Sequence, residues 1–304
     1  MNTYDPAALE CLAAIVEEGG FERAAQRLNV TQSAVSQRLR ALEAQVGSVL
    51  IVRSRPLRPT NAGQLLLKHT KQMRLLRADL ERDLKDLAPS SSGGARDEER
   101  ISIAINADSI ATWALDALGE LARRNLPLEI ITDDQDFTQE WLRSGQVLGC
   151  VTTLKQPLRG CKVQPLGAME YVAVASAEFA RKNLPDGLTA HNFRDLTFVC
   201  FNRKDDMQAE FVARRFGLKR VSLSSVFVPS SEGQVRAVAA GWGVSVVPEL
   251  MAAPLIAKGQ LVDLAPGYKL PIQLYWHSWN LESEVLDALS NALTSAAARA
   301  LAKD

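Results

Sequence analysis

The spacing of hydrophobic residues divides the chain into a helical first part and a mixed second part. Up to about Leu87, apolar residues recur every three or four positions, which predicts helices. Residues 89–95, Pro-Ser-Ser-Ser-Gly-Gly-Ala, interrupt this pattern and have the composition of a flexible linker. Beyond them, short β-branched runs alternate with helical stretches, so we expect an α/β domain with a largely parallel sheet. The predicted strands span residues 101–106, 128–133, 147–153, 171–176, 197–202, 222–228, 244–248 and 272–277.

Two short helices joined by a tight turn are predicted between residues 21 and 46. In the first, Ala24 and Ala25 lie on the apolar face and allow a second helix to approach closely. Thr31 suits the N-cap of the second helix, which should end at Gly47. The polar face of the second helix carries short and amide side chains, which can hydrogen-bond base edges in a major groove. These predicted DNA-facing residues are Thr31, Gln32, Ser33, Ser36, Gln37 and Arg40.

A small wing and a long helix are predicted next. Residues 49–52 form one strand of the wing, and proline-containing turns then present arginines toward the DNA backbone or the minor groove. The predicted contacts here are Arg53, Arg55, Arg58 and Thr60, the last of which also caps the long helix. That helix has an apolar stripe at near-heptad spacing, so we expect it to pair with a second copy of the chain. The stripe consists of Leu65, Leu66, Met73, Leu76, Leu80, Leu84 and Leu87.

Charge is distributed in a way that supports DNA binding by this segment. The whole chain has 35 basic and 35 acidic residues, and this balance alone does not indicate nucleic acid. Between Gly20 and Arg77, however, eleven Lys and Arg residues stand against two Glu residues. A local basic surface is what binding to the DNA phosphates requires.

Several other classes of protein are disfavoured by the sequence. No apolar run reaches the ~18 residues that a membrane span needs, and the amino terminus lacks a signal peptide, so we expect a cytoplasmic protein with no membrane partner. The cysteines Cys11, Cys150, Cys161 and Cys200 are scattered and far from the histidines, which predicts buried free thiols rather than a metal or redox site. No nucleophile elbow or P-loop is present, so we predict no enzyme, no catalytic residue and no cofactor.

The residues from Ala24 to Glu43, with Pro59-Thr60-Asn61-Ala62-Gly63, resemble the LysR-type transcriptional regulators. Ile51 departs from the phenylalanine that the family often has, but both residues are apolar. Motifs further along resemble the subgroup of that family typified by ArgP and LysG, which responds to lysine and arginine. They are residues 104–113, Phe201 with Asp205-Asp206-Met207, Ser230-Ser231-Glu232, and Tyr275-Trp276-His277.

The resemblance implies an all-α winged helix-turn-helix, a long linker helix and a periplasmic-binding-protein-like effector domain of two α/β subdomains. We expect the DNA-binding domain at 1–60, the linker and dimerisation helix at 61–88, a hinge at 89–99 and the effector domain at 100–304. Subdomain I should comprise 100–166 and 272–304, and subdomain II 167–271, with crossovers at 164–167 and 266–271. Ligands of such sheets bind beyond the carboxyl ends of the strands, in the cleft between subdomains.

Polar residues at the predicted strand ends are candidates for effector binding. Ser109 begins a helix and is placed to hold an α-carboxylate. Acidic residues on the cleft rim would suit lysine or arginine, each of which carries two positive groups. Ordinary helix capping explains the same residue types equally well. The candidate effector residues are Asp108, Ser109, Thr112, Asp134, Thr153, Asp206, Ser231 and Glu232, whereas Trp113, Trp276 and Trp279 are expected to pack in the core or the cleft wall.

The leading hypothesis is an effector-responsive transcription factor that senses lysine or arginine and controls genes for its export or metabolism. We expect a homodimer or homotetramer on a pseudo-palindromic double-stranded DNA operator, in contact with RNA polymerase. The alternative is an architectural or replication-origin-binding protein that binds DNA without an effector. Calorimetry with lysine and arginine separates these two hypotheses.

Overall fold

The computed structural model describes residues 4–54, 56–87, 101–123, 127–133 and 138–302. The predicted contact Arg55, the candidate Asp134 and the expected hinge at 89–99 lie outside the described residues, as do the side chains of Leu84 and Leu87. None of the described helices is both long enough and apolar enough to cross a membrane.

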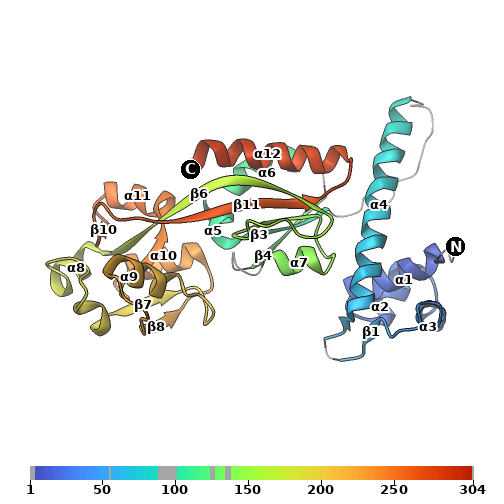
Figure 1. Ribbon diagram of the computed structural model, residues 1–304, viewed down its shortest axis with the longest axis horizontal. Helices are drawn as coiled ribbons and strands as arrows, with labels where there is room; N and C mark the ends of the chain where they lie inside the picture. Colours follow the sequence, from blue (N-terminus) through green and yellow to red (C-terminus); the bar gives the residue numbers. More distant parts are fainter. Residues whose placement is uncertain (1–3, 55, 88–100, 124–126, 134–137, 303–304) are drawn as a thin grey trace.

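The amino-terminal domain is the predicted winged helix-turn-helix, preceded by one more helix (Figure 1). Its core joins Leu12 and Ile15 of the first helix to Ala24 and to Leu39. The Thr31 hydroxyl accepts a hydrogen bond from the Ala34 amide and caps the recognition helix, as predicted. The elements are α1 (Pro6–Glu17), α2 (Phe21–Arg27), α3 (Gln32–Val46), β1 (Ile51–Val52), β2 (Arg58–Pro59) and the long α4 (Asn61–Leu87).

Within the described residues, the effector domain contains a seven-stranded sheet and a separate two-stranded one. The first half of the large sheet is built from β3 (Ile101–Asn106), β4 (Leu128–Asp133) and β5 (Gly149–Thr152), with α5 (Ala107–Ser109), a π-helical turn (Ile110–Ala114), α6 (Leu115–Arg123) and α7 (Thr138–Arg143) between them. We refer to this half as subdomain I.

Subdomain II follows along the chain. It contains α8 (Ala177–Asn183), a 3-10 turn (Asn192–Asp195), β7 (Thr197–Cys200), α9 (Met207–Phe216), β8 (Ser224–Phe227), α10 (Ser231–Ala239), β9 (Ser245–Pro248), α11 (Glu249–Ala257) and β10 (Leu261–Asp263). The last helix, α12 (Glu284–Ala300), returns to subdomain I and lies near α6 (Figure 1).

Two long antiparallel strands, β6 (Cys161–Ser176) and β11 (Leu270–Trp279), run through both subdomains (Figure 1). The expectation of a largely parallel sheet is therefore wrong for the main sheet, whose order is β10-β6-β11-β5-β3-β4 with β9 beside β6. Only β3 pairs in parallel there, with β4 and with β5, among the described strands. Strand-helix alternation predicts parallel pairing, but it does not reveal that two strands double back on each other.

The predicted crossover at 164–167 lies inside β6 rather than between strands. Gly167 pairs with Leu274 and Pro165 with Tyr275, so Leu166 has no register partner and forms a bulge. A bulge accommodates a proline, which has no amide hydrogen, and Gly167 has a φ of 118° that favours glycine. The second predicted crossover, 266–271, leads into the start of β11. The subdomains are thus joined by continuous strands.

Core packing agrees with most of the other predictions. Trp276 and Trp279 are fully buried, and Trp113 is 4% exposed. All four cysteines are free thiols; Cys11, Cys150 and Cys200 are buried as predicted, but Cys161 is only half-buried, so the prediction of burial is wrong for it. Burial raises the pKa of Cys150 above its usual range, so this thiol stays protonated.

Candidate effector cleft and DNA-binding surface

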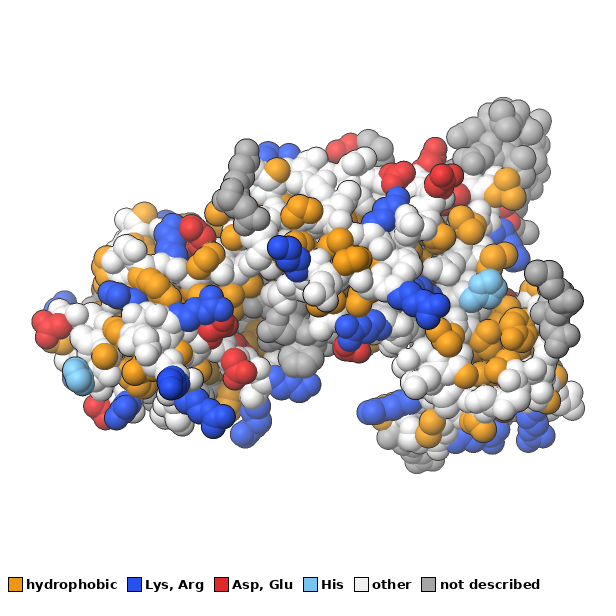
Figure 2. Space-filling model, viewed as in Figure 1, with side chains coloured by type: hydrophobic (Ala, Val, Ile, Leu, Met, Phe, Trp, Pro, Cys, Tyr) orange, Lys and Arg blue, Asp and Glu red, His pale blue; other side chains and the backbone are white. Residues whose placement is uncertain are grey.

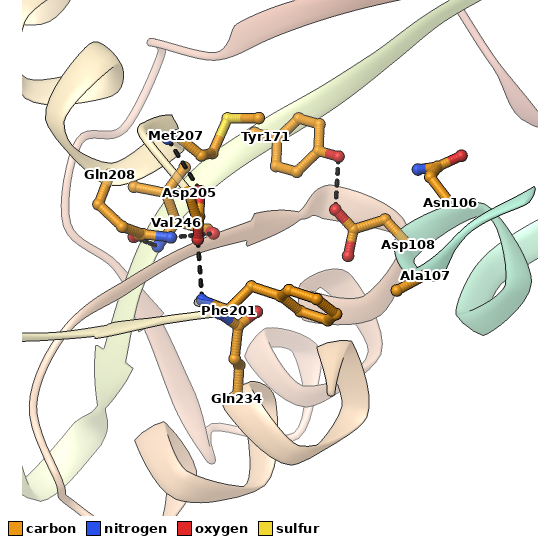
Figure 3. Close-up of a pocket in the computed structure, with 10 residues that line it drawn as sticks. All are labelled: Asn106, Ala107, Asp108, Tyr171, Phe201, Asp205, Met207, Gln208, Gln234 and Val246. Carbon is orange, nitrogen blue, oxygen red and sulfur yellow. Dashed lines mark hydrogen bonds between the residues drawn. The ribbon is translucent and has the colours of Figure 1, made fainter. Parts of the chain in front are cut away.

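A pocket lies between the subdomains, beyond the carboxyl end of β3 (Figure 3). Its cavity volume is about 40 Å³, well below the ~300–1,000 Å³ typical of small-molecule sites, and it is open to solvent. The lining residues are Asn106, Ala107, Asp108, Tyr171, Phe201, Asp205, Met207, Gln208, Gln234 and Val246. Subdomain I supplies the first three, β6 supplies Tyr171, and subdomain II supplies the rest.

Asp108 is the central charged group of this pocket. The Tyr171 hydroxyl donates a hydrogen bond to Asp108 Oδ2 at 2.6 Å, and Figure 3 shows the two side chains facing each other. Burial raises the pKa of Asp108, and the nearby Asp205 carboxylate adds to this, while Ser231 and Tyr171 lower it. The Ser231 hydroxyl is close to the carboxyl but completes no hydrogen bond in the described part of the chain.

The second carboxylate, Asp205, also holds its own loop in place. Its Oδ2 accepts a hydrogen bond from the Phe201 amide at 2.8 Å, and its Oδ1 accepts one from the Met207 amide at 2.9 Å. Gln208 is anchored in a similar way, because its amide group bonds both the N–H and the carbonyl of Val246. The subdomain II wall is therefore preorganised before any ligand binds.

Buried polar atoms without partners gather around this pocket. They are Asn106 Oδ1, Ser109 Oγ, Ser231 Oγ and Gln234 Nε2, none of which has a hydrogen bond within the described residues. All four side chains belong to residues that are 5% exposed or less. Buried polar groups are normally hydrogen-bonded, so these four atoms are available to a polar ligand, although other buried atoms without a partner in the described residues, such as His277 Nδ1 and Trp279 Nε1, belong to residues that do not line the pocket.

The structure brings some of the predicted effector residues together and leaves others apart. Asp108 lines the pocket, and Ser109 and Ser231 are buried next to lining residues. Thr112 instead donates its hydroxyl to the Asp108 carbonyl at 2.7 Å, inside its own helix. The other described candidates do not line the pocket. They are Thr153, which is half-buried, and Asp206 and Glu232, which are exposed.

Several lining residues were not predicted as effector-binding. Asn106 is a polar residue at the end of a predicted apolar strand, and this position was a signal in the sequence. In the structure its side chain is buried, with 2% exposed. Tyr171 lies within an apolar run, and Gln234 lies on an ordinary helix, so neither has a local signal. Of the adjacent acids, Asp205 faces the pocket, whereas Asp206 is the exposed N-cap residue of α9.

The DNA-binding candidates form an exposed surface on α3 and the wing. Gln32, Ser33, Gln37 and Arg40 are exposed, and Ser36 is half-buried. Figure 2 shows basic side chains along the outer edge of this domain.

On the wing, Arg53 and Arg58 are exposed. The Arg53 guanidinium lies 5.3 Å from the centre of the Phe21 ring, a cation-π contact that orients it. Thr60 has a structural task, because its hydroxyl donates to the Val49 carbonyl at 2.8 Å and accepts from the Gly63 amide at 3.1 Å.

The apolar stripe of α4 leaves a row of large side chains in solvent. Leu65, Met73, Leu76 and Leu80 are 72%, 48%, 39% and 56% exposed, respectively. Leu66 instead packs against the core of the DNA-binding domain. In the described residues, no group of three or more metal-binding side chains could hold a metal ion.

Comparison with known proteins identifies both parts of the chain. The family described as bacterial regulatory helix-turn-helix protein, lysR family, matches residues 6–64. The LysR substrate binding domain matches residues 94–298. Among full-length relatives, the HTH-type transcriptional regulator ArgP of Pseudomonas aeruginosa is 40% identical over 308 aligned positions, covering 100% of this chain and 99% of the relative.

Solved structures give the same result. The crystal structure of ArgP from Mycobacterium tuberculosis superposes with a TM-score of 0.85 at 38% identity, covering 100% of both chains. Full-length LysG from Corynebacterium glutamicum, solved with the bound effector Arg, superposes with a TM-score of 0.75 at 34% identity, covering 98% of this chain and 99% of that one.

Proposed function

The chain belongs to the LysR family of DNA-binding transcriptional regulators, and from that premise we propose that its cleft binds a basic amino acid, L-lysine or L-arginine. It is a regulator rather than an enzyme, as its full-length relatives are. One of those relatives, LysG, has been solved with arginine as its effector, which supports the same class of ligand here.

The observation that carries this proposal is the set of unpaired buried polar atoms beside two carboxylates. The Gln234 amide and the Ser109 and Ser231 hydroxyls can donate hydrogen bonds to an α-carboxylate. Asp108 and Asp205 can each accept from a cationic group. Burial is the main cause of the raised Asp108 pKa, and repulsion by Asp205 adds to it, so a cation between these acids would compensate the buried charge and relieve that repulsion. An amino acid with a second positive charge matches this arrangement.

The same geometry suggests how binding is transmitted. Asn106, Asp108 and Ser109 belong to subdomain I, whereas Asp205, Ser231 and Gln234 belong to subdomain II. A ligand that contacts both sets favours the closed cleft over the open one. Closure would move the subdomains relative to each other and alter how the DNA-binding domains are spaced on the operator.

We further propose the assembly and the setting in which this happens. The exposed apolar face of α4 supports a homodimer or homotetramer, because such a face is stabilised by a matching helix. The assembly would occupy a pseudo-palindromic operator in the bacterial cytoplasm and act through RNA polymerase. The regulated genes would be those for export or metabolism of the effector.

Titration calorimetry on the full-length protein tests the ligand. We expect saturable binding of L-lysine or L-arginine and none of L-glutamate or L-norleucine, which lack the second positive charge. A promoter footprint with and without each amino acid then tests the response. Absence of binding by both basic amino acids would refute the proposed effector, and a footprint indifferent to them would favour an architectural DNA-binding protein.

A further inference from the structure

The linker helix α4 touches the effector domain of its own chain through a small, largely polar contact. Lys71 Nζ donates to the Gln146 carbonyl at 2.9 Å, and Lys68 Nζ donates to the Arg159 carbonyl at 3.2 Å. Leu75, one turn further along, is 7% exposed and belongs to the apolar core of the effector domain. We call these three residues, with the loops at 144–146 and 158–160, the docking contact.

Two glycines shape the effector side of the docking contact. Gly145 has a φ of 72°, and a Cβ built on it would lie 2.6 Å from Lys68 Cβ and 2.7 Å from Lys68 Cα. Only glycine therefore lets the helix backbone approach this turn. Gly160 also has a positive φ, 74°, and a Cβ there would lie 3.7 Å from Lys68 Nζ. The Gly145 turn therefore fits the helix closely, whereas the Gly160 turn is only in ordinary van der Waals contact with the end of the Lys68 side chain.

On its other side, the same stretch of α4 is bound to the DNA-binding domain. Arg74 forms ion pairs with Glu10 and Glu17 of α1, and Lys71 lies 3.6 Å from Glu17. The Arg74 side chain is only 10% exposed. These charged contacts, with the apolar packing of α4 on α1, make the DNA-binding domain and this part of the helix one unit.

The docking loops are tied to the strands that carry the cleft. The Leu148 amide bonds the Ser102 carbonyl of β3 at 2.8 Å, and the Asn280 amide, just after β11, bonds the Gly160 carbonyl at 3.1 Å. The other end of β3 carries Asn106 and leads directly to Asp108 in the pocket. Because a paired strand is stiff, subdomain I should move as a rigid body. One end of β3 then lies at the cleft, and the other end lies near the loops that contact α4.

We propose that the docking contact carries movement of subdomain I to the DNA-binding domain, so that it sets the angle between the two. The effector-dependent part of this inference rests on the proposed function, whereas the angle itself is set with or without ligand. The polar character of the contact suits this role, since a few hydrogen bonds between domains can break and re-form where a large apolar interface would not.

Two variants of the full-length protein test the proposal. Lys68→Met with Lys71→Met removes both donors and keeps side-chain length and helix propensity. Gly145→Ala places a methyl group against the Lys68 backbone. Lys182→Met, at an exposed position of α8, is the matched control. Melting temperatures confirm that each variant is folded before it is compared.

Without ligand, hydrogen exchange of 144–148 should be about tenfold faster in both docking variants than in the wild type and the control. The length of the ligand-free promoter footprint should change as well. With arginine or lysine, the docking variants should bind with wild-type affinity, but the footprint should no longer respond.

If both variants show the wild-type rate of hydrogen exchange at 144–148 and the wild-type footprint without ligand, the docking contact does not set the angle between the domains. Faster exchange together with a normal ligand response of the footprint would overturn its role as the relay. If the wild-type protein binds neither basic amino acid, the proposed effector fails, and the ligand-free measurements still decide this inference.

Discussion

At the scale of single residues, the cleft depends on Asp108, a carboxylate that the fold makes costly to ionise. Burial raises its pKa, and the two groups that lower it, Ser231 and Tyr171, are uncharged. Asp108→Asn should weaken effector binding roughly 10- to 100-fold, since a charged hydrogen bond contributes about 1.5–3 kcal/mol. The melting temperature should stay unchanged or rise, because the buried charge is removed.

Calorimetry and thermal denaturation of the variant measure these two effects. Glu178→Gln, which removes an exposed carboxylate on α8, serves as the control. Wild-type effector affinity in Asp108→Asn would show that this carboxylate does not contact the ligand.

The raised pKa of Asp108 also predicts opposite pH dependences for stability and binding. The folded protein holds this proton more tightly than the unfolded chain, so Asp108 reduces stability as pH rises from the ordinary carboxyl pKa, ~4, to the raised value. Effector binding needs the carboxylate and should therefore strengthen over the same window. Melting curves and calorimetry from about pH 4 to 7 should show both trends in the wild type. A variant with Asn at this position should lose them, and if it retains both, another group is titrating.

On the DNA-binding surface, Gln37 and Arg53 are expected to have separable roles. Gln37 is exposed on the recognition helix, and Gln37→Ala should reduce discrimination between operator and random DNA, by about 1–3 kcal/mol for a bidentate base contact. Arg53→Ala should weaken binding to both and lower the salt slope by about one. Fluorescence anisotropy at several salt concentrations measures both quantities. The assignment is wrong if Arg53→Ala alters discrimination and Gln37→Ala alters only the salt slope.

At the scale of elements, glycines mark where strands and side chains come closest. A Cβ on Gly149 of β5 would lie 2.3 Å from the Trp276 ring, which is buried and held by a hydrogen bond from its Nε1 to Ser290 Oγ. Gly149→Ala should therefore destabilise the effector domain by about 1–3 kcal/mol. A Cβ on Gly119 of α6 would contact only the end of the Arg123 side chain. Gly119→Ala should therefore stabilise the effector domain by about 0.5–1 kcal/mol, because alanine favours the helix.

Urea denaturation followed by tryptophan fluorescence measures this pair of variants. All five tryptophans lie in the effector domain, so the signal reports that domain alone. Equal effects of the two substitutions would contradict the packing described for β5.

At the scale of the whole molecule, the exposed face of α4 should set the assembly. Met73→Glu with Leu80→Glu places two charges on that face and should shift the protein toward monomers, because a charge buried in an apolar helix pair is strongly unfavourable. Operator binding should weaken in parallel, since two half-sites are bound together only by a dimer. Sedimentation velocity and a gel shift measure these effects, with Lys258→Glu at the exposed C-cap of α11 as the control. An unchanged oligomer would place the interface elsewhere.

By itself, the sequence determined the parts of this protein that depend on local chemistry. The caps at Thr31 and Gly47, the recognition helix between them and the long helix after Thr60 follow from neighbouring residues and were predicted. The family was predicted from several short motifs that are separated along the chain, and the cleft beyond the end of β3 was expected from that family resemblance.

Only the tertiary structure decided which distant side chains meet. Asp205 and Asp206 are adjacent and chemically identical, so the sequence cannot distinguish them. In the structure the loop directs Asp205 into the pocket and leaves Asp206 exposed to solvent. Tyr171 reaches Asp108 because β6 runs on through both subdomains, a pairing that no local pattern encodes. The apolar side chains of α4 likewise have different surroundings only once the helix is packed: Leu66 joins the core of the DNA-binding domain, Leu75, outside the predicted stripe, joins that of the effector domain, and Leu65, Met73, Leu76 and Leu80 stay exposed. Long-range pairing depends on the packing of the whole chain, and spacing along the sequence cannot report it.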